Sequence, residues 1–167
     1  MERQRALILL GLRTGLRLKV LLSLRIQDVS IDGRICNPIR VREIKNNRCV
    51  SSFKLCLHHQ AAEALQQYLD IRKGRIGYVF NGRTRKPMSP QHGYVLIKDA
   101  FRRAGLIGGS GEIAAHTLRK TLARLAFEAL EHDLVRTSYA LRNVSITSTI
   151  NYLSFEEQVV TDAILSI

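Results

Sequence analysis

Residues 34–55 restrict the fold more than any other part of the sequence, because the spacing of apolar residues changes there. The segment RICNPIRVREIKNNRCVSSFKL contains short runs of β-branched residues, and Asn46 and Asn47 near its centre are typical of a hairpin turn. Apolar residues at helical spacing precede this segment and return after it. The sequence therefore predicts an α+β fold that is mainly helical and carries one small antiparallel sheet.

Capping and turn residues mark the ends of several expected helices. Helical spacing predicts helices in residues 2–12, residues 16–24, residues 59–73, from Pro90 onward, and almost continuously from His116. The first helix should end at Thr14 and Gly15, and Ser89 should cap the helix that begins with Pro90. We expect the segment at residues 58–75 to cover the sheet rather than to read DNA bases. Because no internal repeat or linker is present, the chain reads as one domain over residues 1–167.

The charge balance points to a polyanionic partner. The chain has 26 Lys and Arg against 14 Asp and Glu, a net charge of +12 and a pI of about 10.3, and 46% of its residues are hydrophobic. That apolar content is enough for a cored domain, and a basic cored domain most often meets nucleic acid. A basic protein without a nucleic-acid partner is the alternative. We expect double-stranded DNA as the partner.

Cysteine usage and hydropathy indicate an intracellular chain. Cys36, Cys49 and Cys56 are odd in number and lack both CxxC spacing and paired histidines, so the sequence predicts neither a disulfide framework nor a zinc site. The longest apolar run, ALILLGL, falls far short of the ~20 residues that cross a bilayer, and no signal-peptide pattern precedes it. We expect a cytoplasmic, DNA-associated protein with no membrane partner.

Charged residues at the heads of two apolar helical segments are candidate site residues. Arg17 follows the Thr-Gly turn, and a guanidinium in such a place needs an anion or a structural carboxylate, for which Asp28 is a candidate. His116 and Arg119, three residues apart, share a helix face and could reach one group of ligand oxygens. A capping histidine beside a solvent-exposed arginine is the other interpretation.

Lys45 and Tyr152 also have ordinary structural interpretations. Lys45 stands beside the expected hairpin turn, where a surface cation is common. Tyr152, in SITSTINYLSF, fits a core aromatic whose hydroxyl reaches the surface. Neither residue identifies a reaction by itself.

Taken in order, these residues resemble the tyrosine recombinases, the phage-integrase type of site-specific DNA recombinase, over nearly the whole chain. TGLRLKVLLSLRIQDV resembles the first arginine box, with Arg17 as the arginine, and EIKNNRCVSSFKL resembles the hairpin with the catalytic lysine, Lys45. HTLRKTLA is similar to the His-x-x-Arg box, with His116 and Arg119. ALRNVSITSTINYL resembles the segment that ends in the nucleophile, which is Tyr152 here. Five elements in this order make the resemblance specific.

The resemblance implies a mechanism. Arg17 and Arg119 would hold the non-bridging oxygens of one scissile phosphate and stabilise the charge that develops there. Tyr152 would attack phosphorus and form a covalent phosphotyrosine, assisted by His116, and Lys45 would protonate the departing 5′-oxygen. The family uses no metal, and the sequence has no carboxylate cluster suited to Mg²⁺, so we expect metal independence and no cofactor.

Three positions depart from the family pattern. Asn143 stands where the family has His or Trp, and its amide can donate a hydrogen bond to phosphate but cannot exchange a proton. Val20 replaces a glutamate three residues after Arg17, so a supporting carboxylate is missing. Lys120 replaces a histidine and adds positive charge. These departures leave two other functions open: a DNA-binding domain of the same fold that does not cleave, and a type IB topoisomerase-like enzyme.

The resemblance also extends to assembly. Family members carry an N-terminal core-binding domain, which we expect to be absent from this chain, so DNA binding should be weak and steeply salt-dependent. The C-terminal segment has an apolar stripe, Val159, Val160, Ala163 and Ile164, which we expect to dock on a neighbouring protomer in a homotetramer on DNA. Packing of this stripe against its own domain is the other interpretation. The target DNA sequence, and the choice among integration, excision, resolution and inversion, cannot be read from the chain.

Overall fold

The computed structural model describes residues 1–45, 48–72, 74, 76–82, 86–106, 115–142 and 146–153, without the side chains of residues 44, 45, 48–50, 115 and 116. Contacts between residues divide the chain into two compact units, Met1–Arg119 and Lys120–Ile167. Within the described residues, no helix has the length and apolar content that a membrane-spanning helix needs.

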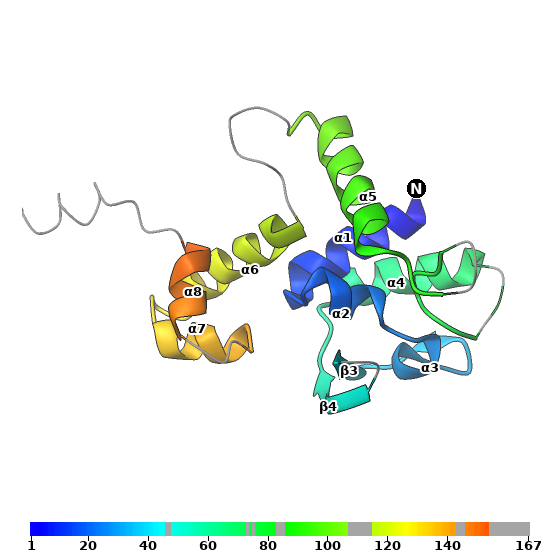
Figure 1. Ribbon diagram of the computed structural model, residues 1–167, viewed down its shortest axis with the longest axis horizontal. Coiled ribbons are helices and arrows are strands. Elements are labelled where there is room, and N and C mark those ends of the chain that lie inside the picture. Colours follow the sequence, from blue (N-terminus) through cyan, green and yellow to red (C-terminus); the bar gives the residue numbers. More distant parts are fainter. Residues whose placement is uncertain are drawn as a thin grey trace, which may run out of the picture. The chain divides into compact units, whose positions relative to one another are not determined.

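Within the described residues, the first unit contains five complete helices and the beginning of a sixth. They are α1 (Glu2–Thr14), α2 (Leu18–Leu22), α3 (Ile26–Val29), α4 (His59–Ile71), α5 (Pro90–Arg103) and the beginning of α6 (Ala115–Ala129) (Figure 1). Two predicted helix ends are confirmed: Gly15 caps α1 in the left-handed conformation with φ of 61°, and the Ser89 side chain accepts a hydrogen bond from the backbone N–H of His92. The helix expected at residues 16–24 is shorter, because α2 begins at Leu18 and ends at Leu22.

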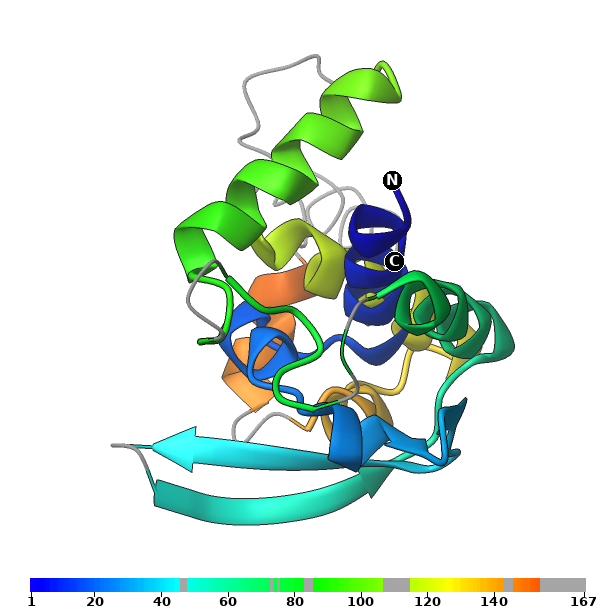
Figure 2. The same cartoon turned by 90° about the vertical axis from the view of Figure 1, so that its right-hand side faces the viewer.

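The strands of the first unit form two separate two-stranded sheets, where the sequence predicted one. β1 (Ser30–Ile31) pairs with β2 (Arg34–Ile35), and β3 (Ile39–Lys45) pairs antiparallel with β4 (Arg48–Leu55), seen as the long ribbon in Figure 2. The expected turn at Asn46 and Asn47 lies outside the described residues, but the strands on both sides of it confirm the hairpin.

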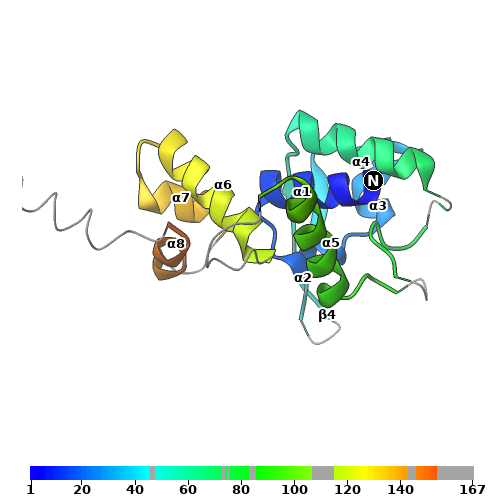
Figure 3. The same cartoon turned by 90° about the horizontal axis from the view of Figure 1, so that it is seen from above.

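The core of the first unit lies between α1, α4 and the chain segments around them. Figure 3 shows α4 alongside α1, and these two helices pack against each other. Phe80 is fully buried and stacks on Tyr68 with 5.7 Å between the ring centroids, and burial raises the pKa of the Tyr68 phenol. The expectation that residues 58–75 cover the sheet is only partly right, because α4 packs mainly on α1 and meets the strands at β2 through Gln66.

The second unit contains the rest of α6, α7 (Leu134–Ala140) and α8 (Ile146–Leu153). Helices α7 and α8 pack against each other. Asp133 caps α7 by accepting hydrogen bonds from the backbone N–H groups of Val135 and Arg136 at 2.8 and 2.9 Å. The helical pattern expected to run on from His116 is interrupted after α6 and after α7. Left-handed residues stand at both breaks, at Glu131, His132 and Arg142.

Candidate active site

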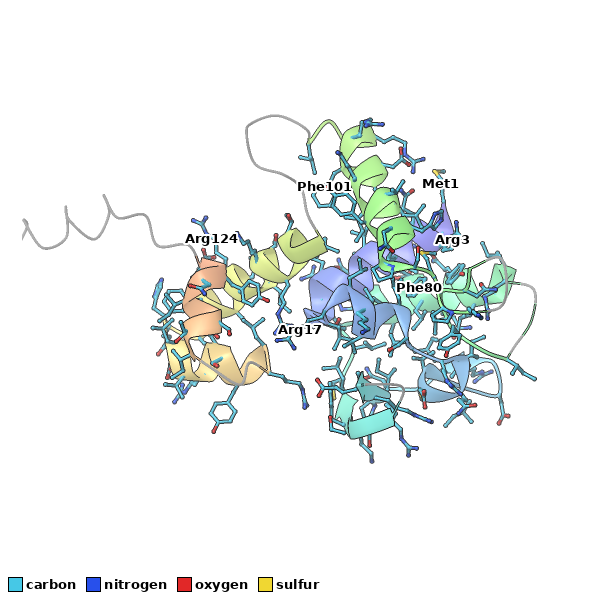
Figure 4. The ribbon with its side chains drawn as sticks, viewed as in Figure 1. Met1, Arg3, Arg17, Phe80, Phe101 and Arg124 are labelled. Atoms are coloured by element: carbon cyan, nitrogen blue, oxygen red, sulfur yellow. The ribbon has the colours of Figure 1, made fainter. Side chains whose placement is uncertain are left out.

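The turn between α1 and α2 presents Arg17. Gly15 adopts the left-handed conformation that ends α1, and Arg17 follows as the N-cap residue of α2, where its carbonyl accepts hydrogen bonds from Val20 and Leu21. The Arg17 side chain, labelled in Figure 4, is exposed and forms no hydrogen bond or ion pair with the residues that the structure describes. The turn therefore offers a guanidinium to a ligand.

Arg119 approaches the same turn from α6. Its guanidinium is almost buried, with 5% of the residue exposed, and it donates a hydrogen bond to the Gly15 carbonyl. The preceding Leu118 is also buried and packs on the Gly11 backbone of α1. This packing places Arg119 beside the turn that carries Arg17. The interpretation of Arg119 as a solvent-exposed residue is thus wrong.

Asp28 serves a different arginine from the one that the sequence suggested. Its side chain is 4% exposed and accepts a hydrogen bond from Arg42 of β3, with 2.6 Å between Oδ1 and Nη2. Asp28 therefore ties α3 to the strand that ends at Lys45. The expected pair between Asp28 and Arg17 is therefore wrong. Asp28 binds Arg42 because α3 packs on β3, which the sequence alone does not reveal.

The remaining predicted residues are only partly described. Lys45 is the last residue of β3 and pairs with Arg48 across the hairpin, and His116 is the second residue of α6, but the side chains of both fall outside the described part. Asn143 lies outside the described residues altogether. Val20, in the position where the family has glutamate, is partly buried and packs against the core of the first unit.

Tyr152 lies near the end of α8 in the second unit and is partly buried. It borders a surface hollow of about 430 Å³ whose walls come from α6 and α8. Lys120, Arg124 and Glu128 line the α6 side of this hollow at intervals of one helical turn. Tyr152 thus borders a hollow that carries two cations and one carboxylate.

Sequence reasoning missed Arg42 and Arg124. Arg124 stands four residues after Lys120, a spacing that predicts a shared helix face and would have identified it. Arg42 gave no such signal, because its partner Asp28 lies in another element. Among the described residues, no group of three or more His, Cys, Asp or Glu side chains is placed to hold a metal ion.

The sequence matches the phage integrase family over residues 1–157, and the chain therefore belongs to this family. Its fold is that of the tyrosine recombinase catalytic domain. A search of curated proteins gave no match.

Solved structures of site-specific recombinases share the fold. XerA recombinase is 21% identical with a TM-score of 0.74, covering 99% of this chain and 58% of its own. XerH recombinase, in a post-cleavage complex with its palindromic difH substrate, is 23% identical with a TM-score of 0.70, covering 97% and 44%. The integrase of mycobacterium phage Brujita is 24% identical with a TM-score of 0.62, covering 89% and 46%. This chain thus spans about half the length of these proteins.

Proposed function

We propose that this chain is the catalytic domain of a site-specific DNA recombinase, which cleaves and rejoins double-stranded DNA through a covalent 3′-phosphotyrosine. Arg17 and Arg119 bind the scissile phosphate, Tyr152 is the nucleophile, and His116 and Lys45 handle protons. Asn143 donates a hydrogen bond to a phosphate oxygen. The proposal treats residues 1–167 as one catalytic domain.

The observation that carries the proposal is the hydrogen bond from the buried Arg119 guanidinium to the Gly15 carbonyl. This contact holds one arginine beside the turn that presents a second one, Arg17. Two guanidinium groups held in advance stabilise the negative charge that grows on the phosphate oxygens in a pentavalent transition state. Membership of the phage integrase family supports the same assignment.

The chemical step exchanges one phosphate ester bond for another. The Oη atom of Tyr152 attacks phosphorus, and the bond between phosphorus and the 5′-oxygen breaks. The phenol, whose ordinary pKa is about 10, loses its proton with the help of His116, and Lys45 gives a proton to the departing 5′-oxygen. Nothing is oxidised or reduced, and reversal of the step by another 5′-hydroxyl rejoins the strand. We propose that no metal ion takes part.

A domain that binds DNA without cleaving it is the second candidate. The observation that favours it is the surroundings of Arg17, which has no carboxylate partner among the described residues while Val20 packs into the core. An arginine without a supporting carboxylate is less firmly oriented. A type IB topoisomerase-like enzyme would use the same chemistry without exchanging strands.

Plasmid relaxation tests the proposal. Negatively supercoiled plasmid is incubated with the chain in EDTA, quenched with SDS, and analysed for relaxed topoisomers and protein-linked DNA. We expect both products from the native chain and neither from Tyr152→Phe, which lacks only the nucleophilic oxygen. Salt-sensitive DNA binding without either product would favour the binding-only function. Activity that appears only when Mg²⁺ replaces EDTA would contradict metal independence.

A further inference from the structure

Two cations line the hollow beside Tyr152, and neither has a role in the chemistry proposed above. Lys120 is exposed and forms no hydrogen bond or ion pair with the residues that the structure describes. Arg124, labelled in Figure 4, lies one helical turn further along α6. Since residues four apart project from the same side of a helix, both cations reach the same space.

The contacts of Arg124 leave most of its donors available. Its Nε atom lies 3.4 Å from Oε1 of Glu128, also on the wall of the hollow, and this is the only ion pair that Arg124 forms within the described residues. The two Nη groups, which make the bidentate contacts of arginine with phosphate, are not used by Glu128. The carboxylate therefore steadies the guanidinium without consuming its phosphate-binding edge.

We propose that Lys120 and Arg124 bind a DNA phosphate on the strand that Tyr152 attacks, next to the scissile phosphate. This inference rests on the proposed function of Tyr152, because only a strand brought to the phenol lies at this hollow. The hollow, at about 430 Å³, is wide and open to the surface, and two cations against one carboxylate leave it net positive. An anionic, flexible backbone fits that chemistry.

The site has a measurable signature that does not depend on cleavage. Each phosphate contact that a protein makes adds about 0.9 to the slope of log affinity against log salt concentration on duplex DNA. In a Tyr152→Phe background, we expect Lys120→Gln and Arg124→Gln each to lower that slope by up to about 0.9 on a mixed-sequence 30-base-pair duplex, since each removes a cation from the contact.

Arg136→Gln supplies a closely matched control. Arg136 lies in the same unit, is 70% exposed against 79% for Arg124, and is likewise joined through Nε to a carboxylate, Asp133, at 3.4 Å. It does not line the hollow. An unchanged slope for Arg136→Gln beside reduced slopes for the other two supports the site. Equal slopes in all four proteins, or equal losses in all three variants, would overturn it.

A second measurement assigns the strand. With Tyr152 restored, the covalent protein–DNA yield is measured at saturating protein, where the loss of affinity alone has no effect. A reduced yield in Lys120→Gln and Arg124→Gln supports a contact on the attacked strand, and a normal yield would overturn that assignment. If Tyr152 proves inactive while the two slopes still fall, the proposed cleavage fails and the phosphate site stands. Unfolding midpoints confirm that each variant is folded.

Discussion

Arg119 is held at the end of α1, where its guanidinium donates a hydrogen bond to the Gly15 carbonyl. The sequence could predict that Arg119 and His116 lie on the same face of a helix, because that depends only on their spacing of three residues. The burial of Arg119 against the end of α1 could not be predicted, because Gly11 and Gly15 lie more than a hundred residues earlier in the sequence. The same limit explains why Asp28 was assigned to Arg17 rather than to Arg42. Spacing predicts which residues share a face, and tertiary packing decides what that face meets.

Gly11→Ala tests how closely Leu118, and with it Arg119, must approach α1. A Cβ atom at Gly11 would lie 2.7 Å from Cδ1 of Leu118 and 3.5 Å from Leu21, so the buried Leu118 must move. Overpacking costs about 1–3 kcal/mol, while alanine in a helix gains about 1 kcal/mol over glycine. We expect a net loss of about 1 kcal/mol in the free energy of unfolding, measured with urea. Because the movement of Leu118 also displaces Arg119, we expect the rate of plasmid relaxation to fall by a larger fraction than the stability does.

Gly93→Ala is the control for that substitution. Gly93 is also buried in a helix, α5, but its added Cβ would lie 3.1 Å from Leu22, a tighter contact than usual that a small shift relieves. We expect it to be close to neutral in stability and to retain activity. Equal losses of stability and activity in the two variants would show that the approach of Leu118 to α1 has no special role.

Two helix ends could be predicted because caps are local, whereas the ends of α2 and the breaks after α6 and α7 could not. Gly15 ends α1 and Ser89 begins α5, as expected from a left-handed glycine and a serine followed by proline. The division of the strands into two sheets could not be predicted, because β1 and β2 are two residues long and carry almost no pattern. The packing of α4 on α1 also depends on residues far apart in the sequence, such as Arg13, which donates a hydrogen bond to the Gln60 side chain.

The start of α4 should be sensitive to acid. Nδ1 of His58 accepts the Gln60 backbone N–H at 3.3 Å, which requires an unprotonated nitrogen. Desolvation lowers the pKa of His58 from its usual 6.5, and the positive charges of His59 and Arg13 lower it further. Because the folded-state pKa is depressed, the stabilising contribution of this cap is complete above about pH 6.5 and is lost as pH falls through the folded-state pKa.

His58→Asn isolates this contribution, since asparagine caps a helix without titrating in this range. We expect the difference in free energy of unfolding between the native chain and the variant to shift in favour of the variant between pH 7 and pH 5. Urea denaturation at a series of pH values measures that difference. A difference that stays constant over this range would show that His58 does not control the cap.

At the scale of the whole molecule, the chain matches about half the length of the recombinases that share its fold. Its net charge of +12 supports the proposed binding to the DNA backbone. A charged surface alone gives neither register nor strand exchange, since contacts to phosphates carry no sequence information. Recombination, as proposed, requires several protomers on one DNA, so the protomer needs a self-association element beyond the residues that handle phosphate.

We propose that the C-terminal segment is that element. Residues 155–167 lie outside the described residues, and the proposal rests on their sequence alone, which spaces Val159, Val160, Ala163 and Ile164 as an apolar helical stripe would be spaced. Deletion of residues 155–167 should therefore lower the association state on DNA, measured by analytical ultracentrifugation of the DNA complex. Replacing the four apolar residues with serine keeps the length and charge of the segment and should have the same effect. If both variants assemble as the native chain does, protomers associate through another surface.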